Sequence, residues 1–461
     1  MKLAAVTLLI LQAAQRIATI GEFPFQLCAL QPIHLLLIAV LSTTVVTVYL
    51  LRRPRTMYLV DYACFKPVDI CRSTKASLLE HARLSPFYSD STVDFIARLL
   101  ELSGMGKETR LPPTSQYIDP YCSLDDARAE AELVVFSTID DLLAKTGINL
   151  DAINVLITNC SGFCPVPSNA DRIMNRYKLR GDIRVINLSG MGCSAAVTAV
   201  GLAKNILQGL PSGSHVLVVS TETLGPHYYK GNTRSMHLVN ILFRMGGSVK
   251  LLSTCGLKAR FKLEHVERTI FGADDSAYRC VYQEEDCDGN RGIALSKDLM
   301  AIARDALKAN ISAIGPLVLP TSELIKYIFF CAATKVLHWR KIMPYVPDSR
   351  KSFEHFCIHV GGPAVINSIQ CGINLSNENV EPSRMTLHRF GNQSSSSVFY
   401  ELAYIEAKGR MRKCDRVWMI GLGAGYKCNT AVWVCMRPPV DANGPWANCI
   451  HRYPVNLSKE G

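Results

Sequence analysis

Residues 187–209 read NLSGMGCSAAVTAVGLAKNILQG, and this stretch decides the fold class. The β-branched run IRVINL, residues 183–188, leads into it and is typical of a strand. Gly190 and Gly192 allow a sharp turn, and the alanine-rich segment that follows predicts a helix ending at Gly209. A strand that passes through a tight turn into a helix is typical of α/β architecture.

Short β-branched apolar runs recur along the chain, at residues 153–158, 216–221, 248–254 and 417–425. Their apolar character is continuous rather than alternating, which indicates strands buried on both faces of a layered α/β fold. A boundary near residues 250–260 divides the chain after the N-terminal segment into two halves of similar length, 56–255 and 256–461.

Cys193 stands where the tight turn becomes the helix. A helix N-terminus carries about half a positive charge, which favours the thiolate form of a cysteine. Its free backbone N–H groups can also hold an oxyanion. The alternative is a small buried residue that packs against the helix. The position of Cys193 in a tight turn favours its interpretation as a nucleophile.

The composition of the chain narrows the possible classes of protein and of binding partner. Apolar residues make up 48% of the 461 residues and charged residues 19%, so we expect a folded chain. The net charge of +11 suits an anionic partner, either a phosphate-bearing substrate or a membrane leaflet. The sequence has no basic run interleaved with aromatic residues, so we do not expect a nucleic-acid partner. The 17 scattered cysteines predict reduced cytosolic thiols and no zinc site.

The N-terminal region, residues 1–55, reads as a membrane anchor. Residues 33–51 are 19 residues without a formal charge, apart from a histidine, which is enough to span a hydrocarbon core of about 30 Å. Three arginines follow and place the rest of the chain in the cytosol. The shorter run at residues 3–14 reads as a signal peptide, as a re-entrant segment or as a first span. We favour an uncleaved anchor.

Residues 314–339 are apolar but carry three charges, which argue against a second span. Two interpretations stay open. The segment is either a buried helix or an amphipathic helix that lies on the bilayer or walls a channel for a lipid chain.

Two further stretches carry polar candidates in loops, where functional side chains concentrate. The stretch FEHFCIHVGGPAVI contains His355 and His359, and LHRFGNQSSSSVFYELAYIE contains His388 and Asn392. Each residue taken alone is more often structural than catalytic.

These stretches, together with NLSGMGCSA and GLGAGYKCN, resemble the active-site blocks of the plant 3-ketoacyl-CoA synthases. The similarity covers nearly all of residues 58–454. It implies a thiolase-like, five-layered αβαβα condensing-enzyme fold with two pseudo-repeated halves.

The resemblance also implies roles for individual residues. The family's Cys-His-Asn triad falls on Cys193, His359 and Asn392. Other positions matching the motif blocks are His355, His388 and His265, with Gly421, Gly423 and Gly425 in a loop that shapes the site. The chain departs from the family in HVERTIFGADD, where Ile270 replaces a histidine that is common there, which puts activity or chain-length range in question.

The activity that the resemblance implies is the condensation of a long-chain acyl-CoA with malonyl-CoA at the endoplasmic reticulum membrane, with the catalytic domain facing the cytosol. It implies no metal or redox cofactor. A homodimer is implied, working with the reductases and dehydratase of fatty acid elongation. The alternatives are a type III polyketide synthase-like enzyme and a non-catalytic elongase subunit. A papain-like hydrolase would need a cysteine signature that the chain lacks.

Overall fold

The computed structural model describes residues 32–52, 54–66, 68–118, 120–336, 348–439 and 444–457. Contacts divide the chain into two units, residues 1–55 and residues 56–461. The first unit holds helix α2 (Pro32–Arg52), which contains the expected spanning segment. Within the part of the chain that the structure describes, no helix combines the length and apolarity needed to cross a membrane. The apolar run at residues 3–14 lies outside the described residues.

The described part of residues 56–461 contains a nine-stranded sheet in the order β3-β2-β4-β5-β1-β6-β11-β10-β9. Its strands are β1 (Tyr58–Cys64), β2 (Ile153–Asn159), β3 (Arg184–Leu188), β4 (His215–Thr221), β5 (Gly247–Ser253), β6 (Phe261–Ile270), β9 (His355–Ile358), β10 (Arg416–Gly423) and β11 (Lys427–Cys435). The five strand-like runs of the sequence are confirmed as β2, β3, β4, β5 and β10. A small antiparallel sheet pairs β7 (Val281–Glu285) with β8 (Arg291–Leu295).

The strand pairing has the same pattern on both sides of the β1–β6 junction. On one side β2 and β4 are parallel, and β5 is antiparallel to both β4 and β1. On the other side β9 and β10 are parallel, and β11 is antiparallel to both β10 and β6. Strands β2, β4 and β10 lie inside the sheet and are almost entirely buried, which explains why they read as continuous apolar runs, whereas β9 is an edge strand.

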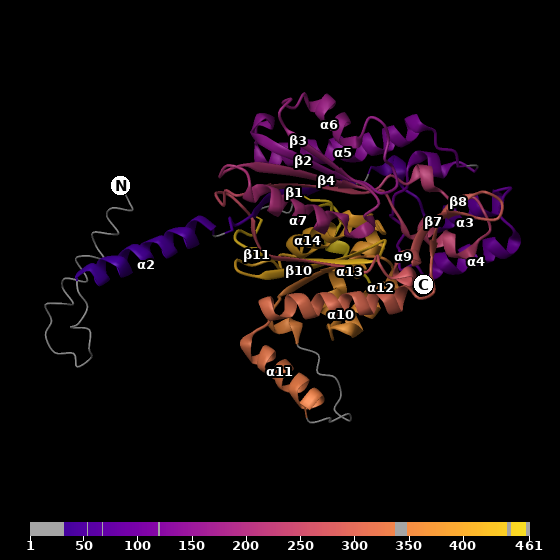
Figure 1. Ribbon diagram of the computed structural model, residues 1–461. Coiled ribbons are helices and arrows are strands. Elements are labelled where there is room, and N and C mark those ends of the chain that lie inside the picture. Colours follow the sequence, from indigo (N-terminus) through magenta and orange to yellow (C-terminus); the bar gives the residue numbers. More distant parts are fainter. Residues whose placement is uncertain are drawn as a thin grey trace. The chain divides into compact units, whose positions relative to one another are not determined.

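Helices α7 (Ala195–Gln208) and α14 (Ser397–Ala407) lie between the two groups of strands (Figure 1). Helix α7 contacts β2 and β4 on one side and β6, β10 and β11 on the other. Its small, apolar residues are almost all buried, because both faces of the helix are covered. Helices α5 (Leu124–Thr146) and α6 (Asn169–Tyr177) cover the first group of strands from outside, and α10 (Leu299–Val318) covers the second.

The remaining helices surround this core. They are α3 (Lys75–Leu84), α4 (Asp90–Leu102), α8 (His237–Leu242), α9 (Asp275–Arg279), α12 (Pro363–Gly372) and α13 (Asn377–Phe390). Helix α12 packs on α10 and α13, and α13 packs on α14.

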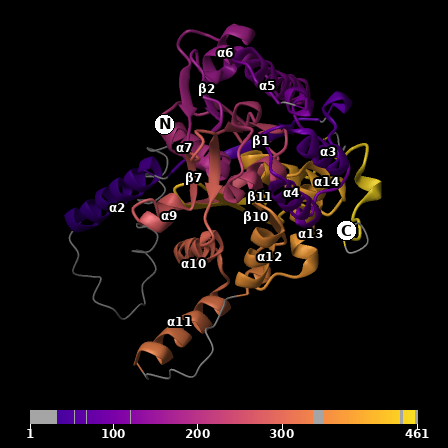
Figure 2. The same cartoon turned by 90° about the vertical axis from the view of Figure 1, so that its right-hand side faces the viewer.

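The apolar segment at residues 314–339 is not a single helix. Its first residues end α10, where Ile314 and Val318 are buried, and the chain breaks before α11 (Thr321–Val336). Figures 1 and 2 show α11 extending away from the strands. Phe329 is 70% exposed, so the buried-helix interpretation is wrong for α11. The bilayer interpretation stays a prediction.

Candidate active site

A cavity of about 600 Å³ lies at one end of the strands, beside the turns that precede α7 and α14. Cys193, His359 and Asn392 all line it. Much of the remaining wall is apolar and includes Leu224, Val239, Phe243, Leu295, Leu299 and Leu422. A wall of this kind is suited to a hydrocarbon chain, with a few polar groups gathered at one place.

The nucleophile turn is a short 3₁₀ turn, Gly192–Ser194, that runs directly into α7. Gly192 has φ +61°, and a Cβ there would lie 2.7 Å from the backbone N of Ala424. A Cβ on Gly423 would lie 2.5 Å from Ser194 Oγ. Both glycines are therefore required, because the 423–425 loop and the nucleophile turn are packed backbone against backbone.

The surroundings of the Cys193 thiol act on its pKa in opposite directions. Burial raises its pKa to about 12, and a hydrogen bond with Ser394 opposes that rise only in part. Ser394 Oγ lies 3.5 Å from Cys193 Sγ. Desolvation of the charged sulfur therefore opposes the ionisation that the helix N-terminus favours.

His359 follows β9 immediately and is held by its backbone N–H, which donates to Ile420 O at 2.9 Å. The side chain is 7% exposed, and burial lowers the pKa of its imidazole to about 4. The ring is therefore neutral at pH 7, with one nitrogen carrying a proton that it can donate. Nδ1 has no hydrogen-bond partner among the described residues.

Asn392 comes from the loop between α13 and α14 and is 2% exposed. Its backbone N–H donates to Leu242 O at 2.9 Å. The backbone N–H of Ser394 donates to Asn392 Oδ1 at 2.8 Å. Because this bond occupies the carbonyl end of the carboxamide, the NH₂ end is left as the group available to a ligand.

Two of the three predicted loop glycines, Gly423 and Gly425, line the cavity. Gly421 instead lies within β10 opposite Asn429, and it is not part of the wall. Ile270, at the end of β6, lines the cavity and is 55% exposed. Ile270 is therefore part of the cavity wall.

The other predicted histidines do not reach the cavity wall. His355 Nε2 pairs with Asp415 Oδ2 at 2.9 Å. His265 sits in the middle of β6, opposite Val432. His388 Nδ1 lies 3.2 Å from the Tyr453 hydroxyl, and the ring packs against Gly106. Proximity in the sequence to His359 or Asn392 did not indicate proximity in space.

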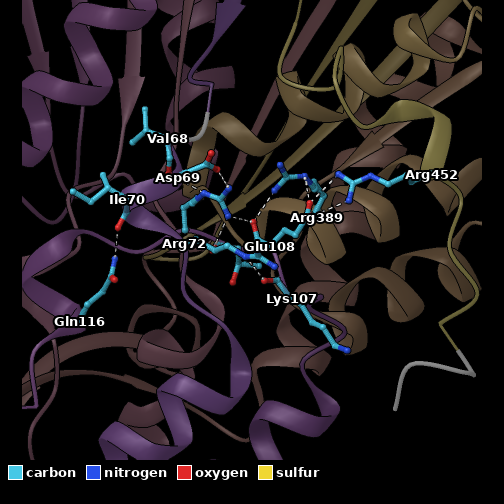
Figure 3. Close-up of polar contacts among 11 residues, drawn as sticks. Val68, Asp69, Ile70, Arg72, Lys107, Glu108, Gln116, Arg389 and Arg452 are labelled. Carbon is cyan, nitrogen blue, oxygen red and sulfur yellow. Dashed lines mark hydrogen bonds and ion pairs between the residues drawn. The ribbon is translucent and has the colours of Figure 1, made fainter.

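The residues next to His388 belong to a network of ion pairs that connects separate segments of the fold. The next residue, Arg389, and Arg452 both bind the Glu108 carboxylate, with Arg452 at 2.8 and 3.0 Å (Figure 3). Arg110 adds an ion pair to Asp69 at 3.1 Å. This network joins the segment around residue 108 to the end of α13 and to the C-terminal region. No residue of the network lines the cavity.

Sequence reasoning missed several polar residues of the cavity, among them Glu222 and Ser394. Glu222, 8% exposed, follows β4 directly, and Ser394 belongs to the serine run after Asn392. An acidic residue at the end of a buried strand is a signal that could have identified Glu222. Within the described residues, no group of His, Cys, Asp and Glu side chains is arranged to bind a metal ion.

Solved structures share this architecture. The 1,3,6,8-tetrahydroxynaphthalene synthase from Streptomyces coelicolor, a bacterial type III polyketide synthase, matches with a TM-score of 0.67 and 18% identity, covering 82% of this chain and 99% of that one. The fungal type III polyketide synthase ORAS matches with a TM-score of 0.63, 14% identity and the same coverage. These matches show a thiolase-like α/β fold of the type III polyketide synthase kind.

Sequence relatives narrow the assignment. Residues 49–336 match the family described as FAE1/Type III polyketide synthase-like protein, and residues 341–433 match the C-terminal domain of chalcone and stilbene synthases. From Arabidopsis thaliana, 3-ketoacyl-CoA synthase 5 is 49% identical, covering 98% of this chain and 91% of that protein. The relative 3-ketoacyl-CoA synthase 6 is 52% identical, covering 89% of this chain and 83% of that protein. The chain therefore belongs to the FAE1/type III polyketide synthase-like family and, within it, to the 3-ketoacyl-CoA synthases.

Proposed function

We propose that the cavity condenses a long-chain acyl-CoA with malonyl-CoA, as the first step of very-long-chain fatty acid elongation. The Cys193 sulfur, once deprotonated, attacks the thioester carbonyl of the acyl-CoA. Coenzyme A leaves as the thiol, and the acyl group stays on the sulfur as a thioester. Backbone N–H groups at the start of α7 bind the oxyanion that forms in this step.

Malonyl-CoA then loses carbon dioxide, and the electron pair of the broken C–C bond becomes an enolate at the thioester carbonyl. Neutral His359 and the NH₂ group of Asn392 donate hydrogen bonds to this enolate. The enolate carbon attacks the acyl-enzyme, the sulfur of Cys193 leaves, and a 3-ketoacyl-CoA two carbons longer is released.

One observation carries this proposal: a single apolar cavity holds the thiol and both oxyanion donors. The sulfur precedes α7 and Asn392 precedes α14, the two central helices. We infer two related halves, residues 56–255 and 256–461, because the strand pairing recurs on both sides of the β1–β6 junction.

The location follows from the substrate. Long acyl chains partition into bilayers, so anchoring beside the endoplasmic reticulum membrane raises their local supply. Leu37, Leu41 and Val45 of α2 are between 59% and 66% exposed, which supports a role for this helix as the anchor. The catalytic unit then faces the cytosol, works as a homodimer, and delivers its product to the elongation reductases and dehydratase.

The test uses microsomes that carry the full-length chain, supplied with radiolabelled malonyl-CoA and a long-chain acyl-CoA. Cys193→Ala should abolish both the acyl-enzyme and the 3-ketoacyl product. Persistent product from Cys193→Ala would refute the assignment. In yeast, the wild-type chain should add fatty acids of about twenty carbons or more, whereas product from short or aromatic starters alone would favour polyketide chemistry.

A further inference from the structure

One face of helix α11 is apolar and open to solvent. Ile325, Ile328 and Phe329 are between 56% and 70% exposed, and Ala332 is exposed as well. Because an α-helix turns once every 3.6 residues, these four positions form a single stripe along the helix. Contiguous exposed apolar side chains of this kind mark a surface that contacts a protein partner or a membrane.

The opposite face of α11 fixes the helix to the rest of the unit formed by residues 56–461. Glu323 is 0% exposed and accepts a hydrogen bond from Lys351 Nζ at 2.7 Å. Its second carboxylate oxygen accepts from the backbone N–H of Asp348 at 3.2 Å. At about 100° per residue, Glu323 lies on the other side of the helix from Ile328. The first turn is therefore held in place, and the apolar stripe is left pointing outward.

The charge that reaches solvent at the base of α11 is positive. The side chains of Lys326, Arg350 and Lys351 are 56%, 44% and 50% exposed. The carboxylates that they pair with are covered, with Glu323 at 0% and Asp348 at 28%. An anionic lipid surface attracts exposed cations of this kind. An apolar stripe accompanied by basic residues is typical of helices that lie in a membrane interface.

Other occupants fit this face less well. Helix α11 has 16 residues, a length of about 24 Å, which is shorter than a hydrocarbon core of about 30 Å, so it does not span a bilayer. A stable contact between two protein copies uses about 20–30 residues of each partner, many more than the stripe contains. No described residue of α11 lines the cavity, which argues against a role as a wall of the acyl site.

We propose that α11 lies in the surface of the bilayer, with its apolar stripe among the lipid chains and Lys326 at the headgroups. The proposal rests on the membrane anchoring by α2 proposed above. One apolar stripe gives only reversible membrane binding. The tether supplied by α2 keeps α11 at a high effective concentration beside the lipid, so the two contacts act together. Helix α2 then determines whether the protein is on the membrane, and α11 determines which side of the catalytic unit faces it.

The experiment places the full-length protein in vesicles of phosphatidylcholine and phosphatidylserine that contain a lipid with a photoreactive diazirine in its acyl chain. After irradiation, mass spectrometry should find lipid adducts on the tryptic peptide spanning residues 327–335. The double variant Ile328→Ser, Phe329→Ser should lower the ratio of docked to free helix by about 10²-fold, because two side chains no longer bury apolar surface in the lipid. Its adducts should fall to background.

Leu102→Ser is the matched control, since Leu102 at the end of α4 is equally exposed, at 75%, and lies outside the stripe. This variant should keep the adducts of the wild-type protein. Lys326→Gln, or vesicles without phosphatidylserine, should reduce the adducts several-fold, because the attraction between cations and anionic headgroups is lost. Lys351 still pairs with Glu323 in Lys326→Gln, so the base of the helix stays fixed.

Wild-type protein that floats with the vesicles but carries no adduct on residues 327–335 would overturn the proposal. A double variant with wild-type adducts would overturn it as well. Cross-links that join this peptide in two copies of the chain, in place of lipid adducts, would assign the stripe to a dimer contact instead. Protein that does not float with the vesicles would contradict the α2 anchor, and the inference about α11 would fall with it.

Discussion

Replacing Asn392 by aspartate tests the oxyanion site with a nearly isosteric change. The Ser394 N–H holds Oδ1 at 2.8 Å, and an aspartate oxygen can keep that bond. What is lost is the NH₂ group, one of the two side-chain donors at the enolate. Removal of one such donor costs about 2.7–4 kcal/mol, or about 10²–10³ in rate. If the new carboxyl ionises, its charge repels the enolate and the loss increases.

The assay separates the two half-reactions. Acyl-enzyme formation depends on Cys193 and should continue in Asn392→Asp, whereas carbon dioxide release from labelled malonyl-CoA should fall by the amount above. Asn429→Asp is the matched control, because Asn429 is equally buried but bonds Thr198 and does not line the cavity. Decarboxylation by Asn392→Asp at the rate of the control would refute the role assigned to the carboxamide.

Three further predictions concern stability, packing and the anchor. Burial lowers the pKa of both His359 and His237 from 6.5 to about 4. The free energy of unfolding should therefore be highest above pH 6.5 and should fall by about 3 kcal/mol per histidine as the pH drops to 4. Urea unfolding at a series of pH values measures this change. Gly423→Ala should push Ser194 and the nucleophile turn, lowering stability by about 1–3 kcal/mol and slowing Cys193 acylation; unchanged acylation would contradict this. Removing residues 1–55 should move the protein from the membrane pellet to the supernatant after centrifugation; continued pelleting would contradict an anchor role.

Local features were predictable from the sequence because their causes are local. The glycines before Cys193 determine the turn, and the apolar run after it determines α7. Strands β2 to β5 were recognisable because burial on both faces requires continuous apolar residues. Helix α11 begins at Thr321, one of two residues whose side chains suit a helix N-cap, and Pro320 stands in the break after α10.

The chemistry of the site was harder to predict, because it depends on contacts between distant segments. Ser394 and Glu222 are 172 residues apart, and no local pattern pairs them. The pKa of Cys193 depends on how many groups close around the sulfur, which a helix N-terminus alone does not indicate. His355 and His388 lie four residues from His359 and Asn392, yet strand and helix geometry direct them to Asp415 and Tyr453 instead.

The division of the cavity between the two groups of strands has a consequence for biosynthesis. The sulfur is translated well before the imidazole and the carboxamide, and β10 and β11, which complete the second group, come later still. A nascent chain that has emerged only as far as β5 contains Cys193. It still lacks the second group of strands and the side chains of His359 and Asn392. The complete cavity therefore requires the strands that are translated last.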